Sequence, residues 1–227
     1  MKKLAYLILL LLMNTALPAQ DWADLDKYRA ANEALTPPAE GDARVVFMGN
    51  SITESWAADT AGILHNNKNY VGRGISGQTT PQMLIRFRPD VLALQPEVVV
   101  ILAGINDIAH NTGPMSIEET AGNIYSMAEL AEANGIEVVL CSVLPAYDFP
   151  WRPGMEPAQK VVALNRLLKD YADRHGHVYV DFFTPMADGR PGLPARFAYD
   201  EVHPTALGYR TMEPLVERGI RAALAKR

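Results

Sequence analysis

Apolar residues recur along the chain in short runs of strand length, separated by longer segments with helical spacing. The short runs are rich in Val, Ile and Leu, and most lack the in-out alternation of a half-exposed strand. Continuous runs of this kind are typical of strands that are buried on both faces of a parallel sheet. We therefore predict five strands, over residues 44–48, 69–71, 98–103, 137–143 and 177–182.

The segments between these strands place apolar residues three and four positions apart, as one buried face of a helix requires. The expected helices cover residues 79–94, 116–134, 157–175 and 205–225. Ser116 with Glu119 three residues later matches a capping box, and Asn134-Gly135 supplies a helix stop. Strands that alternate with helices of this length predict an α/β fold with a parallel sheet and helices on both sides.

The N-terminus has the layout of a secretory signal peptide. Two lysines are followed by an apolar run over residues 4–13 and by small residues that end near Ala19. A membrane anchor is the alternative, but about ten apolar residues are too few for a bilayer, which needs roughly 20. We therefore expect a signal peptide over residues 1–20 and one domain over residues 21–227. The expected product is secreted or periplasmic, without a stable membrane anchor after signal cleavage.

Charge and cysteine content narrow the classes of function. The 21 Lys and Arg residues against 26 Asp and Glu form no basic cluster, which argues against a nucleic-acid partner. The five histidines are scattered, and His175 and His177 have no ligands at zinc-like spacing, so we expect no metal and no cofactor. Cys141, the single cysteine, lies in an apolar run where burial suppresses the thiolate. The oligomeric state is left open.

Ser51 directly follows the first expected strand, at a strand-to-helix turn. In an open parallel sheet, ligands bind beyond the carboxyl ends of the strands, so this serine lies on the ligand side. A nucleophile at that position is assisted by free backbone N–H groups and by the helix dipole. A structural role is the alternative, because Ser51 with Glu54 three residues later is also a capping box. The motif alone does not decide between the two.

Two more motifs follow the second and third expected strands. The segment 72–77 matches G-x-G-x-x-G, but it follows the second strand, and Glu97 opens its strand instead of closing it. We therefore expect no dinucleotide site and interpret the glycines as turn formers that bring backbone N–H groups near a ligand. After the third strand, Asn106 could donate its amide to an oxyanion and Asp107 could cap the next segment. An Asx-turn is the alternative for both.

Asp200 and His203 stand three residues apart near the C-terminus, just before the last helix. A carboxylate at this distance can hold the imidazole in one tautomer and stabilise its protonated form, as a serine-activating base requires. Taken alone, Asp200 could equally cap a turn, and His203 could simply precede Pro204.

Together these motifs resemble the SGNH hydrolases, also called the GDSL esterase/lipase family. The four family blocks occur in order, around Ser51, at Gly74, at residues 104–107 and at residues 200–204. The resemblance covers nearly the whole mature domain and implies a flavodoxin-like, three-layer α/β/α sandwich with about five strands. The sequence departs from the family at Asn50, where the family name has Asp. That carboxylate is not the triad acid, so the change puts only local turn contacts in doubt.

The resemblance also implies a role for each site residue. Ser51 would be the nucleophile, His203 its general base and Asp200 the residue that orients His203. The oxyanion hole would comprise the backbone N–H groups of Ser51 and Gly74 and the side-chain amide of Asn106. An acyl-enzyme on Ser51 would then be hydrolysed by water.

The longest loop on the ligand side, residues 144–154, contains Tyr147, Trp151 and Arg152, which we interpret as substrate contacts. Packing in a small satellite core is the alternative for these side chains. No insertion is present to cover a lipid tail, and the resembling family includes acetylesterases that act on carbohydrates. We therefore expect hydrolysis of short-chain esters, in particular O-acetyl groups on carbohydrates. A lysophospholipase or thioesterase of the same family and a non-catalytic carbohydrate-binding protein are the alternatives.

Overall fold

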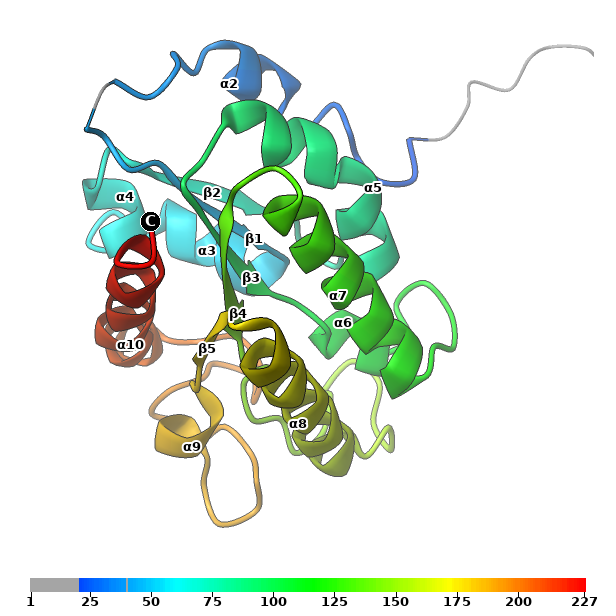
Figure 1. Ribbon diagram of the computed structural model, residues 1–227. Coiled ribbons are helices and arrows are strands. Elements are labelled where there is room, and N and C mark those ends of the chain that lie inside the picture. Colours follow the sequence, from blue (N-terminus) through cyan, green and yellow to red (C-terminus); the bar gives the residue numbers. More distant parts are fainter. Residues whose placement is uncertain (1–20, 40) are drawn as a thin grey trace, which may run out of the picture.

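The structure, a computed structural model, describes residues 21–39 and 41–227, so the predicted signal peptide lies outside the described residues. A five-stranded parallel sheet forms its centre, in the order β2-β1-β3-β4-β5 (Figure 1). The strands are β1 (Val45–Gly49), β2 (Tyr70–Gly74), β3 (Val98–Leu102), β4 (Glu137–Cys141) and β5 (Val178–Val180). The predicted order of strands and helices and the parallel sheet are confirmed.

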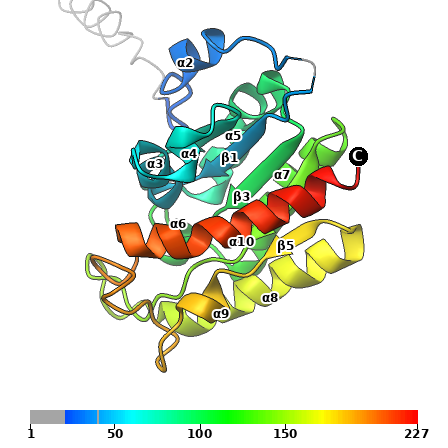
Figure 2. The ribbon, with the colours of Figure 1, turned by 90° about the vertical axis from the view of Figure 1, so that its left-hand side faces the viewer.

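Helices cover both faces of the sheet, which makes the three predicted layers (Figures 1 and 2). One face carries α5 (Thr80–Asp90), α7 (Ile117–Glu132) and α8 (Pro157–His175), and the other carries α3 (Ser51–Ala58) and α10 (Ala206–Leu224). The shorter helices are α2 (Arg29–Glu33), α4 (Ile63–Asn66), α6 (Ile105–Ile108) and α9 (Phe183–Met186). Within the described residues, no helix combines the length and the apolar character that crossing a membrane requires.

Burial on both faces explains why the strands are continuous apolar runs in the sequence. Every residue of β1 and of β3 is buried. Val46 and Met48 of β1 face the core under α5, α7 and α8, whereas Val45 and Phe47 face the core under α3 and α10. Because neither face of these strands meets water, the alternation of polar and apolar residues is absent.

The helix ends follow the local signals with one exception. The capping box of α7 is confirmed, since the Glu119 N–H donates to Ser116 Oγ at 3.1 Å and the Ser116 N–H donates to Glu119 Oε2 at 2.8 Å. The helix predicted over residues 79–94 instead ends at Asp90, and a separate 3₁₀ turn covers Leu92–Leu94. Pro89 cannot donate to the helical ladder, which weakens the last turn of α5.

Gly72 and Gly74 let α3 lie directly on β2. A Cβ atom at Gly72 would come within 2.5 Å of the Ala57 Cβ, and one at Gly74 within 2.2 Å of the Glu54 nitrogen. Only glycine allows this close approach of strand and helix. The G-x-G spacing is therefore explained by packing, and it brings the first turn of α3 to the carboxyl ends of the strands.

Candidate active site

Ser51 occupies the first turn of α3, immediately after β1. Its Oγ lies 2.9 Å from Nε2 of His203, so the fold joins two residues that are 152 positions apart. The cap of the helix is Asn50, whose side chain accepts the Ile52 N–H at 3.1 Å. The capping interpretation of Ser51 is therefore wrong, and the asparagine found in place of the family's aspartate serves as the cap.

Asp200 holds His203 from the side opposite Ser51. Its Oδ2 lies 2.8 Å from Nδ1 of His203, and its Oδ1 accepts the backbone N–H groups of His203 at 2.8 Å and Val202 at 3.2 Å. Burial alone would raise the pKa of Asp200, but the hydrogen bonds from His203 outweigh burial and hold this pKa below its usual range. Glu201, in the left-handed region at φ 68°, turns the chain back so that the carboxylate reaches the ring. Asp200 thus caps the turn and orients the imidazole at the same time.

Asn106 lies in α6, directly after β3, and is 5% exposed. Its Nδ2 donates one hydrogen to the Gln78 carbonyl at 3.0 Å. A side-chain amide carries two N–H groups, so the second can serve a ligand. The neighbouring Asp107 accepts the Thr80 N–H at 3.0 Å and the Thr80 hydroxyl at 2.6 Å, which anchors α6 to α5. Burial raises the pKa of Asp107 to about 6.

Gly74 does not face the site. It is the last residue of β2, the edge strand of the sheet, and the Ile75 N–H bonds the Gly49 carbonyl on the β1 side. Since backbone groups alternate between the two sides of a strand, the N–H and carbonyl of Gly74 point to the outer edge. The Tyr28 hydroxyl donates to the Gly74 carbonyl there. This placement contradicts the predicted role of Gly74 in the oxyanion hole.

The loop that follows β2 is bound on both sides by the elements that carry the other site residues. On the α3 side, Glu54 Oε2 accepts the Ser76 N–H at 2.8 Å and the Ser76 hydroxyl at 2.5 Å. On the α6 side, Asn106 bonds the Gln78 carbonyl. Gly77, between these two anchors, therefore lies between the first turn of α3 and Asn106.

Gly77 lies in this loop with the backbone conformation of a tight turn. Its φ of +77° is left-handed, and its carbonyl accepts the Asn111 amide at 3.1 Å. Among the residues that the structure describes, no hydrogen bond engages the N–H of Gly77 or that of Ser51. The missed sequence signal was a glycine outside the strand, in the polar turn before α5, where a left-handed conformation is needed.

Of the three loop residues expected to contact substrate, Trp151 lies beside the triad. Its ring centroid is 6.0 Å from that of His203, and its other neighbour is Phe149, stacked at 5.2 Å. The indole is 45% exposed, so part of its surface is open to a ligand next to the imidazole.

Arg152 and Tyr147 are engaged with other parts of the protein. The Arg152 guanidinium donates to the carbonyls of Ala109 and His110, which ties the loop to the end of α6. The Tyr147 ring is covered by the Arg190 guanidinium at 4.9 Å, on the side of a groove between the loop and the start of α8. We therefore assign Arg152 to holding the loop, and we find no contact between Tyr147 and the triad among the described residues.

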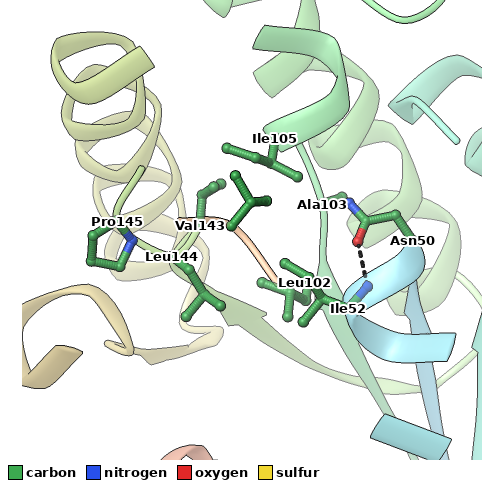
Figure 3. Close-up of a pocket in the computed structure, with 9 residues that line it drawn as sticks. Asn50, Ile52, Leu102, Ala103, Ile105, Val143, Leu144 and Pro145 are labelled. Atoms are coloured by element: carbon green, nitrogen blue, oxygen red, sulfur yellow. Dashed lines mark hydrogen bonds between the residues drawn. The ribbon is translucent and has the colours of Figure 1, made fainter. Parts of the chain in front are cut away.

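A small apolar recess is lined by residues that flank Ser51 and His203 in the chain (Figure 3). It is lined by Asn50, Ile52, Leu102, Ala103, Ile105, Val143, Leu144, Pro145 and Val202. Its volume of about 10 Å³ is close to what one water-sized group needs. The recess can therefore take a methyl-sized group.

A wider and more polar groove of about 280 Å³ begins at His203 on the side of α3 and α10. Its lining includes Ser55, Asp59, Tyr199 and Tyr209, and Tyr199 is 77% exposed. The polar groove thus reaches His203 itself, whereas the smaller apolar recess is lined by the chain neighbours of Ser51 and His203.

Within the part of the chain that the structure describes, neither the cysteine nor the metal-ligating residue types form a further site. Cys141 is buried, and burial raises the pKa of its thiol well above the ordinary value. Within residues 21–39 and 41–227, no three His, Cys, Asp or Glu side chains are grouped so that they could hold a metal ion.

Comparisons with known proteins identify the relatives of this chain. The model of the GDSL-like lipase/acylhydrolase family matches residues 47–211. A solved structure from Bacteroides fragilis, assigned as an acylhydrolase, is 45% identical, covers 90% of this chain and 99% of its own, and has a TM-score of 0.87. A GDSL-like lipase from Bacteroides thetaiotaomicron is 46% identical, covers 88% of this chain and 98% of its own, and has a TM-score of 0.85.

A more distant similarity is to an acetylxylan esterase from Geobacillus stearothermophilus. It is 26% identical over 152 residues, which are 61% of this chain and 66% of that esterase. The chain thus spans just under two thirds of the length of that relative.

Proposed function

The chain belongs to the GDSL-like lipase/acylhydrolase family of carboxylic ester hydrolases, and we propose that it removes short acyl groups, in particular acetyl groups, from carbohydrate hydroxyls. The observation that carries the proposal is the hydrogen-bonded series Ser51–His203–Asp200 at the N-terminus of α3. A serine hydroxyl bonded to an imidazole that a carboxylate orients is the arrangement that activates serine for acyl transfer.

In the first half of the reaction, Ser51 Oγ attacks the ester carbonyl carbon while His203 Nε2 takes the hydroxyl proton. The tetrahedral intermediate then collapses, and the same imidazole returns that proton to the departing alcohol oxygen. In the second half, His203 removes a proton from water, which attacks the acyl-enzyme carbonyl carbon. When the bond from this carbon to Ser51 Oγ breaks, the imidazolium returns its proton to Ser51 Oγ and the acid leaves. Asp200 stays ionised throughout and stabilises the imidazolium.

The negative oxygen of each intermediate needs hydrogen-bond donors that are already in place. In this proposal they are the N–H groups of Ser51 and Gly77 and the second N–H of Asn106. The support is that hydrogen bonds hold the residues on either side of Gly77, which keeps the loop next to α3 and Asn106. Ser76 is held by Glu54, and the Gln78 carbonyl is held by Asn106 itself.

The acyl and alcohol parts of the substrate are assigned to two different spaces near the triad. The apolar recess of about 10 Å³, lined by Asn50 and Ile52 on either side of Ser51 in the chain, suits a methyl group and lacks the length for a lipid tail. The polar groove toward α3 and α10, together with the exposed Trp151, suits an alcohol that carries many hydroxyls. Export through a signal peptide over residues 1–20 is part of the same proposal, because it would place the enzyme among extracellular or periplasmic glycans.

Hydrolysis of p-nitrophenyl esters of increasing acyl length tests the acyl assignment. We expect kcat/KM to be highest for acetate and to fall from butyrate onward, because longer chains exceed the apolar recess. A preference for octanoate over acetate would contradict the proposal and favour a lysophospholipase or thioesterase.

Acetylated xylo-oligosaccharides test the carbohydrate assignment. Trp151→Ala is expected to raise KM for these sugars by about tenfold, since stacking contributes on the order of 1–1.5 kcal/mol. The same variant should leave kcat/KM for p-nitrophenyl acetate within a factor of about three. Trp22→Ala, which removes an equally exposed indole from a different groove beside α5, serves as the matched control. Equal KM values for all three proteins would argue against a carbohydrate substrate.

Asn106→Ala is expected to lower kcat for acetyl esters by about 10²–10³ with little change in KM, as loss of one oxyanion donor does. Thermal unfolding and kcat would be measured on the same preparation, with Asn134→Ala at the end of α7 as a control. Near-normal kcat in the folded Asn106 variant would remove this residue from the oxyanion hole.

A further inference from the structure

Arg86 in α5 is a fully buried cation at the place where β1 and β2 end. Its Nη2 donates to the Gly49 carbonyl at 2.9 Å, its Nη1 to the Arg73 carbonyl at 2.9 Å, and its Nε to Gln78 Oε1 at 2.5 Å. These three acceptors belong to β1, to β2 and to the loop that follows β2. One planar group thus joins three separate segments.

These segments continue in the chain into residues that carry or bind the proposed oxyanion donors. Gly49 stands two residues before Ser51. Gln78 directly follows Gly77, and its carbonyl accepts the Asn106 amide at 3.0 Å. The relative positions of the three donors therefore depend on the group that binds the Gly49 carbonyl and the Gln78 side chain at once.

We propose that Arg86 is a positioning residue of the oxyanion hole. It touches neither the substrate nor the reacting atoms, and it acts by fixing the end of β1 and the Gly77 loop in one relative position. The inference rests on the proposed acyl transfer at Ser51. It adds a residue of α5 to a site whose other members follow β1, β2, β3 and β5.

The chemistry of arginine fits this role better than a role in stability alone. Nη1 of Arg86 also donates to Asp90 Oδ2 at 3.0 Å, so the charge is paired, and both side chains are buried. A buried ion pair is often no more stabilising than apolar residues of the same size. A guanidinium, however, presents donors in a rigid fork, which allows it to hold several carbonyls at fixed angles.

Residues 23 and 32 of the N-terminal segment also form hydrogen bonds with the partners of Arg86. Gln78 Nε2 donates to the Ala23 carbonyl at 2.7 Å, so the Gln78 amide is bound at both ends. Asn32 Nδ2 donates to Asp90 Oδ1 at 2.7 Å, which occupies the second oxygen of that carboxylate. Figure 1 shows α2 lying over α5 at this edge of the sheet. These bonds fix Gln78 and Asp90, the two side chains that bind the Arg86 guanidinium.

Three variants test the role in hydrolysis of p-nitrophenyl acetate. The double variant Arg86→Met with Asp90→Leu removes both buried charges together, so that neither remains unpaired. Arg86→Lys keeps the charge but cannot reach all three acceptors. Gln78→Leu breaks the bond to the loop and leaves the ion pair intact. Leu168→Ala in the core beneath α8 controls for loss of stability without a change near the site.

The double variant should lower kcat by about 10–100-fold with KM within about threefold, because displacement of donors by about 1 Å affects the transition state most. Arg86→Lys and Gln78→Leu should lie between this variant and the wild type. The midpoint of the acid limb of the kcat/KM profile should not move, since the triad is intact.

If the double variant does not fold, Arg86→Lys and Gln78→Leu decide the question. Values of kcat within threefold of wild type in folded variants, or a shifted acid limb, would overturn the role of Arg86 while leaving the proposed esterase intact. A wild-type protein without esterase activity would overturn both proposals.

Discussion

Replacing Ser51 with alanine is expected to lower kcat for acetyl esters by about 10⁴ or more. In the proposed reaction this hydroxyl forms the acyl-enzyme, and it is hydrogen-bonded to His203 Nε2 at 2.9 Å. The remaining activity would come from the oxyanion donors and from substrate binding. The change removes one oxygen atom, so unfolding temperature should change little.

The measurement is hydrolysis of p-nitrophenyl acetate, combined with mass spectrometry after treatment with a fluorophosphonate. The wild type should gain one covalent adduct on Ser51, and the alanine variant should gain none. Ser126→Ala on α7, remote from the strand ends, should behave like the wild type in both assays. Undiminished hydrolysis by the Ser51 variant would disprove the central proposal.

Asp200→Asn is expected to lower kcat by about 10⁴ while the protein stays folded. The amide can still accept the backbone N–H groups of Val202 and His203, which preserves the turn. It cannot hold the imidazole in the tautomer that accepts the Ser51 proton, nor stabilise the imidazolium. Asp173→Asn, an exposed carboxylate on α8, is the matched control.

The pH dependence of folding gives a second readout for Asp200. Its pKa is lowered in the folded protein, so its stabilising contribution is present above the ordinary aspartate pKa and is lost as pH falls through the lowered value. The wild type should therefore lose more stability than Asp200→Asn when pH falls below about 4, at the usual aspartate range. Because the carboxylate is partly exposed, the difference should be small. Parallel stability curves would mean that the bonds to His203 contribute nothing to folding.

The fold could be predicted from the sequence because its causes are local. Val98–Leu102 is wholly apolar since both faces of β3 are covered, and that property is visible in any five-residue window. The start of α7 is likewise set by Ser116 and Glu119, which bond each other across one turn. The strand ends differ from the predicted ones by up to three residues, and α5 ends four residues before the predicted end, where Pro89 and the following 3₁₀ turn shorten an apolar periodic segment.

The role of Ser51 was not decided by its own motif, because a helix cap and a nucleophile have the same local sequence. Two tertiary contacts argue against the cap and support the proposed nucleophile. Asn50 takes the cap, and His203, which is 152 positions away, binds the hydroxyl. Glu54, the other half of the expected capping box, bonds Ser76 and Lys27 instead.

The error at Gly74 has a similar cause. Successive backbone N–H groups of an extended strand point to opposite sides, so the choice of glycine depends on which side of β2 pairs with β1. That pairing is a long-range property, seen in the bond from the Ile75 N–H to the Gly49 carbonyl. Gly77 lies beyond the strand, where bonds from α3 and α6 fix the loop.

The sequence by itself determined the order of strands and helices, the three-layer class and the candidates for the proposed triad, since apolar periodicity and residue chemistry are properties of short segments. Only the tertiary structure decided where those groups point. It placed Trp151 beside His203, turned Arg152 to the carbonyls after α6, and joined Arg86 to three segments. The physical reason is that hydrogen bonds act over about 3 Å and require direction. Partners from distant parts of the chain meet these conditions only after the sheet and its helices have packed.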